Sequence, residues 1–246
     1  MTLQPERTAP RSPLKRTNRT RLKTALIIAS VVLLVPYALA PLYRVVNPVS
    51  TLMLWRWATG QRVEHTFVPI DRIAPVLPAT VILSEDGTFC RNRGIDLGAM
   101  REAIEQSGDD MAESRGASTI TQQTAKNLFL WQGRSFVRKA LELPLALWLN
   151  VVLPKRRVME IYLNIVEWGP NGEFGAEAAS HYAFDRPARN LSGREAAELA
   201  SILPNPVRRS ARAPNALVRR LAGILERRAA DFPGHDSCLR NPASAP

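Results

Sequence analysis

The longest apolar stretch lies near the N-terminus, where 20 uncharged residues run from Thr24 to Tyr43. A helix of about 20 apolar residues is long enough to cross the ~30 Å hydrocarbon layer of a bilayer. The 23 residues before it contain seven Lys or Arg residues and one acidic residue, Glu6. Because basic flanks tend to remain in the cytoplasm, the pattern predicts a basic cytoplasmic leader over 1–23, a single membrane-spanning helix over 24–43 and an exported remainder.

A cleavable secretory signal is the alternative interpretation of this stretch, since Ala38, Leu39 and Ala40 resemble a small-residue processing site. The basic leader is long for a signal peptide, and Pro41 would directly follow the cut, so the anchor is favoured. The bulk of the chain is exported in either case. Cys90 and Cys238 could pair in that oxidising space, but a free buried thiol is an equally good expectation.

Helical spacing of apolar residues dominates the chain after a Pro-punctuated juxtamembrane connector over 44–77, which we expect to be irregular. Capping residues precede several of these segments, and Pro144 predicts a kink or break in one of them. The apolar run 143–153 is too short to span a membrane and is expected to be a core helix. An alternating strand pattern is missing from the sequence, so the fold class is mainly α, with helices expected over 96–106, 118–131, 135–153, 154–169, 192–204 and 215–230.

Composition limits the function classes without choosing one. The chain has 246 residues, 46% of them apolar, which is enough for one or two domains with a sizeable core. Its formal charge of +11 suits an anionic partner: nucleic acid, an anionic bilayer face or a phosphorylated substrate. Two distant cysteines and three histidines make a zinc enzyme an unexpected outcome.

Four polar clusters could carry chemistry, although each also has an ordinary structural interpretation. Glu85 and Asp86 follow an apolar stretch and could be a solvated turn. Small and polar residues over 115–127 could bind sugars or phosphates, or could simply cap a helix. Arg138 and Glu142 share a helix face and could be a surface ion pair. The last cluster is KRRVMEIYLN (155–164), whose apolar positions are typical of a core.

Taken together, in this order and at these separations, the clusters resemble the glycosyltransferase domain of peptidoglycan polymerases, and most closely its monofunctional branch. The resemblance covers roughly 78–206, and because only about 40 residues follow it, we expect no transpeptidase domain. The segments that carry it are EDGTFCRNRG (85–94), RGASTITQQ (115–123) with Lys126 and Asn127, RKALE (138–142), KRRVMEIYLN (155–164), WGPNGEFGAEAAS (168–180) and LPNP (203–206).

The resemblance implies a lysozyme-like, mostly helical domain over 78–232 with a smaller membrane-proximal lobe, followed by a flexible tail over 233–246. It also implies that a sugar 4-hydroxyl of lipid II attacks the anomeric carbon of the growing glycan, with inversion and release of undecaprenyl diphosphate. Residues 128–131 (LFLW) would then face lipid, although core packing explains them equally well.

Roles follow from the positions in these motifs. Glu85 is the expected general base, and Glu142 is the second carboxylate, which orients cations or a metal ion near the diphosphate. The expected substrate-binding residues are Ser118, Thr119, Thr121, Gln122, Gln123, Lys126, Asn127, Arg138 and Lys139. The expected supporting residues are Asp86, Phe89, Glu160, Tyr162 and Asn164.

The implied partners are lipid II, the nascent glycan strand, the membrane and the cell-wall synthesis machinery, and not nucleic acid. A divalent cation, Mg or Mn, could neutralise the leaving diphosphate, and no organic cofactor is expected. The implied location is the bacterial inner membrane, crossed once, with the N-terminus in the cytoplasm and the catalytic domain in the periplasm.

Four positions depart from the family pattern or have no explanation in it. Asn92 stands where His is usual, and Ala117 stands where a second glycine is common. Pro144 follows Glu142 closely and could change the aim of its carboxylate, while Cys90 lies unexplained inside the first motif.

Two other functions remain open at this point. A lytic transglycosylase or muramidase would share the lysozyme-like lobe and the glutamate, but it has no need of a cationic diphosphate pocket. A membrane-tethered protein that binds nucleic acid or anionic lipid is suggested by seven arginines, which lack interleaved aromatics and are better explained as a solvated basic face. These are Arg208, Arg209, Arg212, Arg219, Arg220, Arg227 and Arg228.

Overall fold

A computed structural model describes residues 14–107, 118–133, 135–232 and 234–240. The chain divides into two units, 1–39 and 40–246. The first unit contains α1 (Leu14–Leu39), and within the described residues one segment, Thr20–Arg44, is long and apolar enough to cross a membrane. This agrees with an N-terminal membrane anchor or signal. Residues 1–13 of the predicted leader lie outside the described part.

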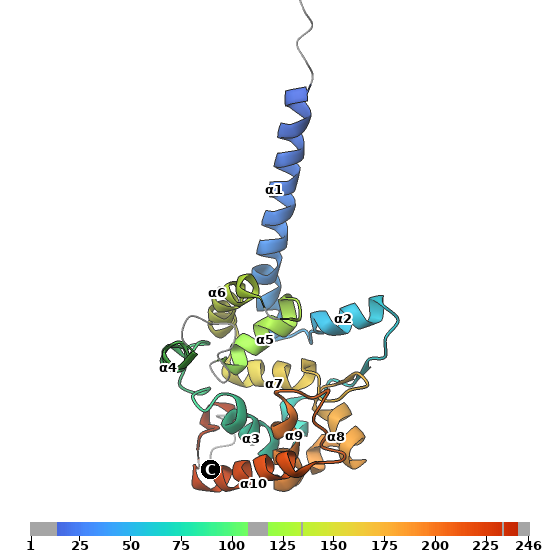
Figure 1. Cartoon of the computed structure of the whole chain (residues 1–246), viewed down its shortest axis with the longest axis vertical. Helices are drawn as coiled ribbons and strands as arrows, with labels where there is room; N and C mark the ends of the chain where they lie inside the picture. The colour runs from blue at the N-terminus through green and yellow to red at the C-terminus, as the bar shows by residue number, and fades with distance from the viewer. Residues whose placement is uncertain (1–13, 108–117, 134, 233, 241–246) are drawn as a thin grey trace, which may run out of the picture. The chain divides into compact units, whose positions relative to one another are not determined.

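Helices make up most of the second unit, which confirms the mainly α prediction (Figure 1). The strands β1 (Glu64–His65) and β2 (Glu173–Phe174) pair in parallel, with Glu64 opposite Glu173. Short 3₁₀ helices are η1 (Ala40–Arg44), η2 (Ile70–Arg72), η3 (Ala188–Asn190) and η4 (Ser237–Leu239). The α-helices are α2 (Thr51–Ala58), α3 (Val76–Glu85), α4 (Leu97–Ser107), α5 (Ile120–Phe129), α6 (Phe136–Val152), α7 (Lys155–Ile165), α8 (Ala176–Phe184), α9 (Gly193–Ile202) and α10 (Ala216–Asp231).

Local capping fixes where several helices begin. The Thr119 hydroxyl accepts a hydrogen bond from the backbone N–H of Gln122, and the Gln122 side chain accepts one from the N–H of Thr119. Ser192 and Glu195 form the same reciprocal capping box at α9, as predicted. Such caps satisfy N–H groups that have no partner within the helix, typically contributing about 1 kcal/mol each.

Helix α7 packs against α5, α6 and α8 and against the short helices η2 and η4. Helix α5 packs against α6 and α7, while α9 packs against α3 and α10. Most residues of α7 are buried, and Tyr162 and Trp168 are among the largest side chains that are almost completely inaccessible. Because α7 contacts several elements at once, its polar residues can position segments that are far apart in the sequence.

Three expectations about secondary structure are wrong. The helix expected over 154–169 ends at Ile165, because the following backbone pairs with the strand region: Trp168 N–H donates to Glu173 O, and Gly175 N–H donates to Val166 O. Helix α6 continues through Pro144, so the expectation of a break is wrong, while the kink that was its alternative stays a prediction. Residues 44–77 are not irregular throughout, since they contain α2 and β1.

A disulfide joins Cys90 to Cys238, across a sequence separation of 148, and decides a pairing that the sequence left open. It explains the cysteine inside the first motif. It also ties η4, which lies in the expected flexible tail, to the loop that follows α3. Residues 241–246 of that tail lie outside the described part of the chain.

Candidate active site

Glu85 is the last residue of α3 and is mostly buried. One carboxylate oxygen accepts a hydrogen bond from Gln123 Nε2 at 2.9 Å, and the other accepts one from Ser84 Oγ at 3.2 Å. Burial raises the pKa of Glu85, and these hydrogen bonds together with the charges of Lys126 and Arg209 oppose that rise. A carboxylate with a raised pKa is a better proton acceptor for a hydroxyl group.

Tyr162 fixes the orientation of the amide that binds Glu85. Its hydroxyl donates to Gln123 Oε1 at 3.1 Å, which leaves Gln123 Nε2 to donate to the carboxylate. Tyr162 is fully buried, and burial together with the charges of Glu85 and Asp86 raises its pKa well above the usual range. The phenol therefore keeps its proton and acts as a hydrogen-bond donor.

Asp86 is buried, with only 8% of its surface exposed, so its carboxylate contacts other protein groups. Its carboxylate accepts hydrogen bonds from the N–H of Ile120 at 3.0 Å and from Asn92 Nδ2 at 3.0 Å. It thereby connects the loop after α3 to the first residue of α5. Its contacts agree with the supporting role predicted for it.

Asn92 and Lys155 extend this network. Lys155 Nζ donates to Asn92 Oδ1 at 2.9 Å and lies 4.7 Å from the centre of the Phe89 ring, which is fully buried. Burial lowers the pKa of Lys155 to about 8. Asn92 therefore bridges a carboxylate and an ammonium group, so the position at which the family usually has His holds a structural link in this chain.

A second carboxylate, Glu142, is enclosed by cations. It is 3% exposed and forms ion pairs with Arg138 and, at 3.4 Å, with Lys139. Lys139 Nζ also donates to Ser118 Oγ at 2.6 Å, and Arg138 Nε is buried without a hydrogen-bond partner in the described residues. The pKa of Lys139 is lowered to about 8, mainly by burial and to a smaller extent by repulsion from Arg138 and Lys126.

Lys126 connects the two carboxylate regions. Burial lowers its pKa, the nearby charge of Arg138 lowers it further, and the charge of Glu85 raises it. Lys126 is thus close enough to interact electrostatically with both Glu85 and Arg138. An excess of buried positive charge is costly without an anion nearby, so the cluster is suited to an anionic group.

Four predicted substrate ligands have buried side chains. Thr119 and Gln122 form the cap of α5, and the Thr119 hydroxyl also donates to Gly94 O at 2.6 Å. Thr121 is fully buried, with its hydroxyl unpaired within the described chain, and Asn127 is 7% exposed. Their roles as substrate ligands stay predictions. The other predicted substrate ligands that interact with Glu85 or Glu142, directly or through Lys139, are Ser118, Gln123, Lys126, Arg138 and Lys139.

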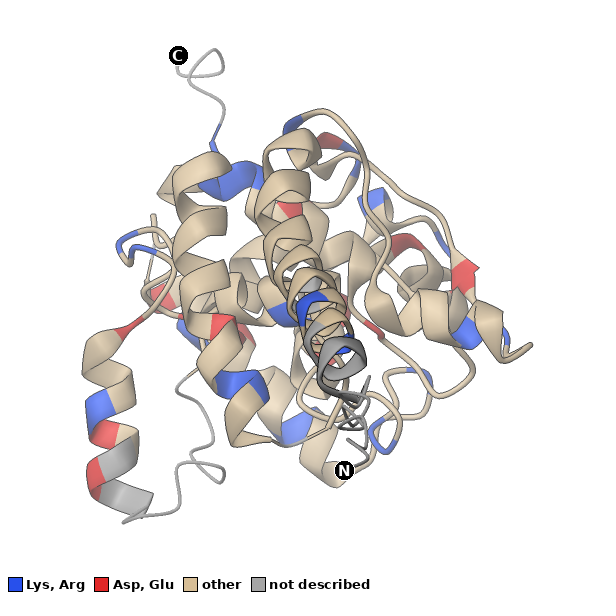
Figure 2. Ribbon diagram, turned by 90° about the horizontal axis from the view of Figure 1, so that it is seen from above, with Lys and Arg blue, Asp and Glu red and all other residues tan. Residues whose placement is uncertain are grey.

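Two residues of this site were missed by sequence reasoning. Arg209 is close enough to Glu85 to lower its pKa, and it donates to Ser201 O at 2.8 Å; the sequence placed it in a solvated basic face. Lys155 was included only as the first residue of the cluster over 155–164, with no role of its own. The exposed arginines of α10 do belong to a solvated surface, and Lys and Arg are spread over many elements among Asp and Glu residues (Figure 2).

A metal site is not built from the carboxylates in the described residues, which contain no group of three or more His, Cys, Asp or Glu side chains placed to hold an ion. The carboxylate of Glu142, the expected orienting group, already faces two cations. Mg²⁺ is often bound by one or two carboxylates together with substrate phosphates, so a divalent cation beside the diphosphate stays a prediction, and we derive no step through one.

An apolar cavity of about 540 Å³ lies between α2 and the end of α5. It is lined in part by Leu52, Trp55, Phe129 and Trp131. Of the four residues over 128–131, Leu128 and Leu130 are buried, while 49% of Trp131 is exposed. Core packing is confirmed for Leu128 and Leu130, while contact of Trp131 with lipid stays a prediction.

Comparison with known proteins finds similarity over most of the chain. A family model described as transglycosylase matches residues 53–229. The biosynthetic peptidoglycan transglycosylase of Rhodopseudomonas palustris (strain TIE-1) is 56% identical over 214 residues, which cover 87% of this chain and 90% of the relative. The proteins of the same description from Nitrobacter hamburgensis and Rhizobium meliloti are 54% and 49% identical, over 85% and 92% of this chain and 92% and 95% of their own lengths.

Proposed function

The chain belongs to the family of biosynthetic peptidoglycan transglycosylases, enzymes that polymerise glycan strands from lipid II, and we propose that Glu85 and the cluster around Glu142 divide this reaction between them. The hydrogen-bonded, mostly buried carboxylate of Glu85 supports the role of general base. The cations around Glu142 support binding of the diphosphate.

Glu85 removes the proton of the sugar 4-hydroxyl as that oxygen attacks the anomeric carbon of the growing glycan. The new glycosidic bond forms on the face opposite the diphosphate, so the configuration inverts. Gln123, held by Tyr162, keeps one oxygen of Glu85 fixed, which leaves the carboxylate pre-oriented toward the incoming hydroxyl.

The bond between the anomeric carbon and the diphosphate oxygen breaks, and the electron pair leaves with undecaprenyl diphosphate. This group is a stable anion, so it needs charge neutralisation rather than a proton. Arg138, Lys139 and Lys126 supply that positive charge, and Glu142 holds the first two in place. Arg138 Nε, which has no partner among the described residues, is free to donate to a phosphate oxygen.

The membrane supplies the substrate. The apolar stretch Thr20–Arg44 acts as an uncleaved anchor, with the basic leader in the cytoplasm and the catalytic unit in the periplasm. The apolar cavity beside Trp131 receives part of a prenyl chain. The nascent glycan strand and the cell-wall synthesis machinery are the further partners in this proposal.

The observation that carries the assignment of roles is the Glu85–Gln123 hydrogen bond beside a buried cation cluster. Glu85→Gln should lower the rate of lipid II polymerisation by about 10²- to 10⁴-fold, the usual contribution of a general base. Thermal unfolding and binding of lipid II should change little. Glu105→Gln, on an exposed position of α4, is the control that removes a negative charge elsewhere. Unchanged turnover in Glu85→Gln would remove Glu85 from this role.

A further inference from the structure

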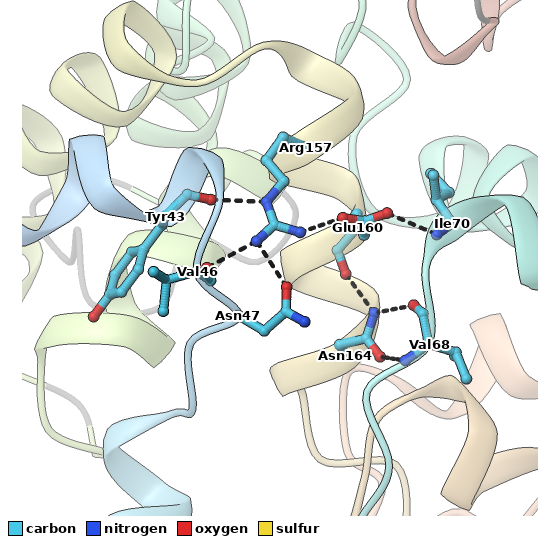
Figure 3. Close-up of polar contacts among 8 residues, drawn as sticks. All are labelled: Tyr43, Val46, Asn47, Val68, Ile70, Arg157, Glu160 and Asn164. Carbon is cyan, nitrogen blue, oxygen red and sulfur yellow. Dashed lines mark hydrogen bonds and ion pairs between the residues drawn. The ribbon is translucent and has the colours of Figure 1, made fainter.

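Arg157 lies near the start of α7 and binds the segment where the chain enters the second unit (Figure 3). Its Nε donates to Tyr43 O at 2.7 Å, and its Nη2 donates to Val46 O at 2.8 Å and to Asn47 Oδ1 at 2.9 Å. Its remaining terminal nitrogen pairs with Glu160. Only 12% of the Arg157 side chain is exposed. Its bond to Tyr43 O is partly buried, whereas its bonds to Val46 and Asn47 lie at the exposed edge of the segment.

The same face of α7 also holds a second segment. Glu160 Oε2 accepts a hydrogen bond from the N–H of Ile70 at 2.7 Å. Asn164 accepts one from the N–H of Val68 at 2.8 Å and donates one to the carbonyl of Val68 at 2.9 Å. Most of these bonds involve backbone groups, so this face fixes the path of the chain over 43–47 and 68–70 (Figure 3).

Another part of α7 reaches the catalytic residues. Tyr162 donates to Gln123, which binds Glu85, and Lys155 binds Asn92, which binds Asp86. An 11-residue helix is a rigid element about 16 Å long. The position of segment 43–47 relative to Glu85 is therefore set in part through α7, alongside the hydrogen bond from Arg44 Nε to Val152 O of α6.

We propose that Arg157 is a positioning residue that sets the location of Glu85 relative to the segment leaving the membrane. A substrate whose lipid tail is embedded in a bilayer cannot move freely toward the protein, so the protein must bring its base to the level of the headgroups. A misplacement of about 1 Å can cost about 100-fold in rate. A soluble substrate can diffuse to the site wherever that site lies. The inference rests on the proposed uncleaved anchor.

The test compares two substrates with one preparation of the full chain in liposomes. The first substrate is lipid II embedded in the same liposomes, and the second is a water-soluble analogue with a short prenyl chain. Arg157→Met should lower turnover of the embedded substrate at least about tenfold more than turnover of the soluble analogue. Arg156→Met is the matched control, because Arg156 pairs with Asp71 in η2 and not with segment 43–47; it should leave the ratio unchanged.

A second variant covers the case in which Arg157→Met does not fold. Arg157→Lys keeps a positive charge for Glu160, but one ammonium group cannot reach all the acceptors on 43–47 together. It should therefore also lower turnover of the embedded substrate more than turnover of the soluble analogue, by a smaller factor than Arg157→Met. Equal losses on both substrates, or no loss on either, would overturn the proposal. Alkaline extraction of the wild-type liposomes tests the anchor separately. Release of the protein would contradict the anchor and with it the positioning role of Arg157, whereas the proposed roles of Glu85 and Glu142 would stand.

Discussion

We expect Lys139 to make the reaction sensitive to pH in the alkaline range. Its ammonium group lies 2.6 Å from Ser118 Oγ and 3.4 Å from Glu142, and its pKa is lowered to about 8 by burial and by two neighbouring cations. Below pH 8 the group is charged and can bind the diphosphate. As the pH rises through 8 the proton is lost, so kcat/KM should fall.

The size of this fall follows from the protonated fraction. A group with a pKa of about 8 is mostly protonated at pH 7 and about 3% protonated at pH 9.5, so kcat/KM should fall about 30-fold over that range. The fall should level off at the contribution of one charge-assisted hydrogen bond, about 1.5 to 3 kcal/mol or roughly 10- to 150-fold.

Two variants separate Lys139 from other groups. Lys139→Arg keeps a cation that stays protonated over the whole assay range, so the alkaline limb of the pH profile should move up by more than about one pH unit. Lys155→Arg is the matched control, because Lys155 also has a pKa of about 8 but binds Asn92. The assay is the initial rate of lipid II polymerisation at subsaturating substrate, measured from about pH 6 to about pH 10 at constant ionic strength.

A limb that stays near pH 8 in Lys139→Arg would refute this reasoning and would assign the titration to a different group, with Lys126 as the next candidate. A shift of the alkaline limb of the kcat/KM profile in Lys155→Arg would contradict it as well, because the titrating group would then be Lys155, which lies outside the cation cluster around Glu142.

Three further predictions concern stability and the orientation of the base. Replacing Cys90 and Cys238 by Ala should lower the free energy of unfolding by about 2 to 5 kcal/mol, since the bond closes a long loop; denaturant titration without reductant measures this, and an unchanged midpoint would contradict it. Tyr162→Phe leaves Gln123 Oε1 without its donor and should lower kcat about fivefold or more, the equivalent of about 1 kcal/mol, whereas an unaltered kcat would show that the amide needs no support. Glu142→Gln removes the carboxylate from buried cations and should destabilise the protein by about 3 to 5 kcal/mol at neutral pH; inorganic pyrophosphate should recover part of that loss in thermal unfolding, and no recovery would count against an anion site.

Helix starts could be read from the sequence because their causes are local. The side chains of Thr119 and Ser192 accept hydrogen bonds from the backbone N–H groups three residues later. The Arg138–Glu142 pair follows from i, i+4 spacing. The end of α7 could not be read in this way. The helix stops at Ile165 because residues 166–168 form backbone hydrogen bonds with residues 173–175.

The candidate site was predictable to the extent that it follows sequence motifs. Glu142 lies beside Arg138 and Lys139, as the resemblance implies. The hydrogen bond from Gln123 to Glu85 was not predicted, since the motif implied only that Gln123 binds substrate. The links made by Lys155 to Asn92 and by Arg209 toward Glu85 join segments that only the tertiary structure brings together. The capping roles of residues such as Thr119 had been foreseen as an alternative, but the sequence could not show that their side chains are buried.

The disulfide has a consequence for the order in which the enzyme matures. Cys90 lies five residues after Glu85, and its partner is synthesised 148 residues later. Until that second thiol has been translated and oxidised, no covalent cross-link restrains the loop beside Glu85. In the topology proposed above, this loop is therefore fastened only after nearly all of the polypeptide has crossed the membrane.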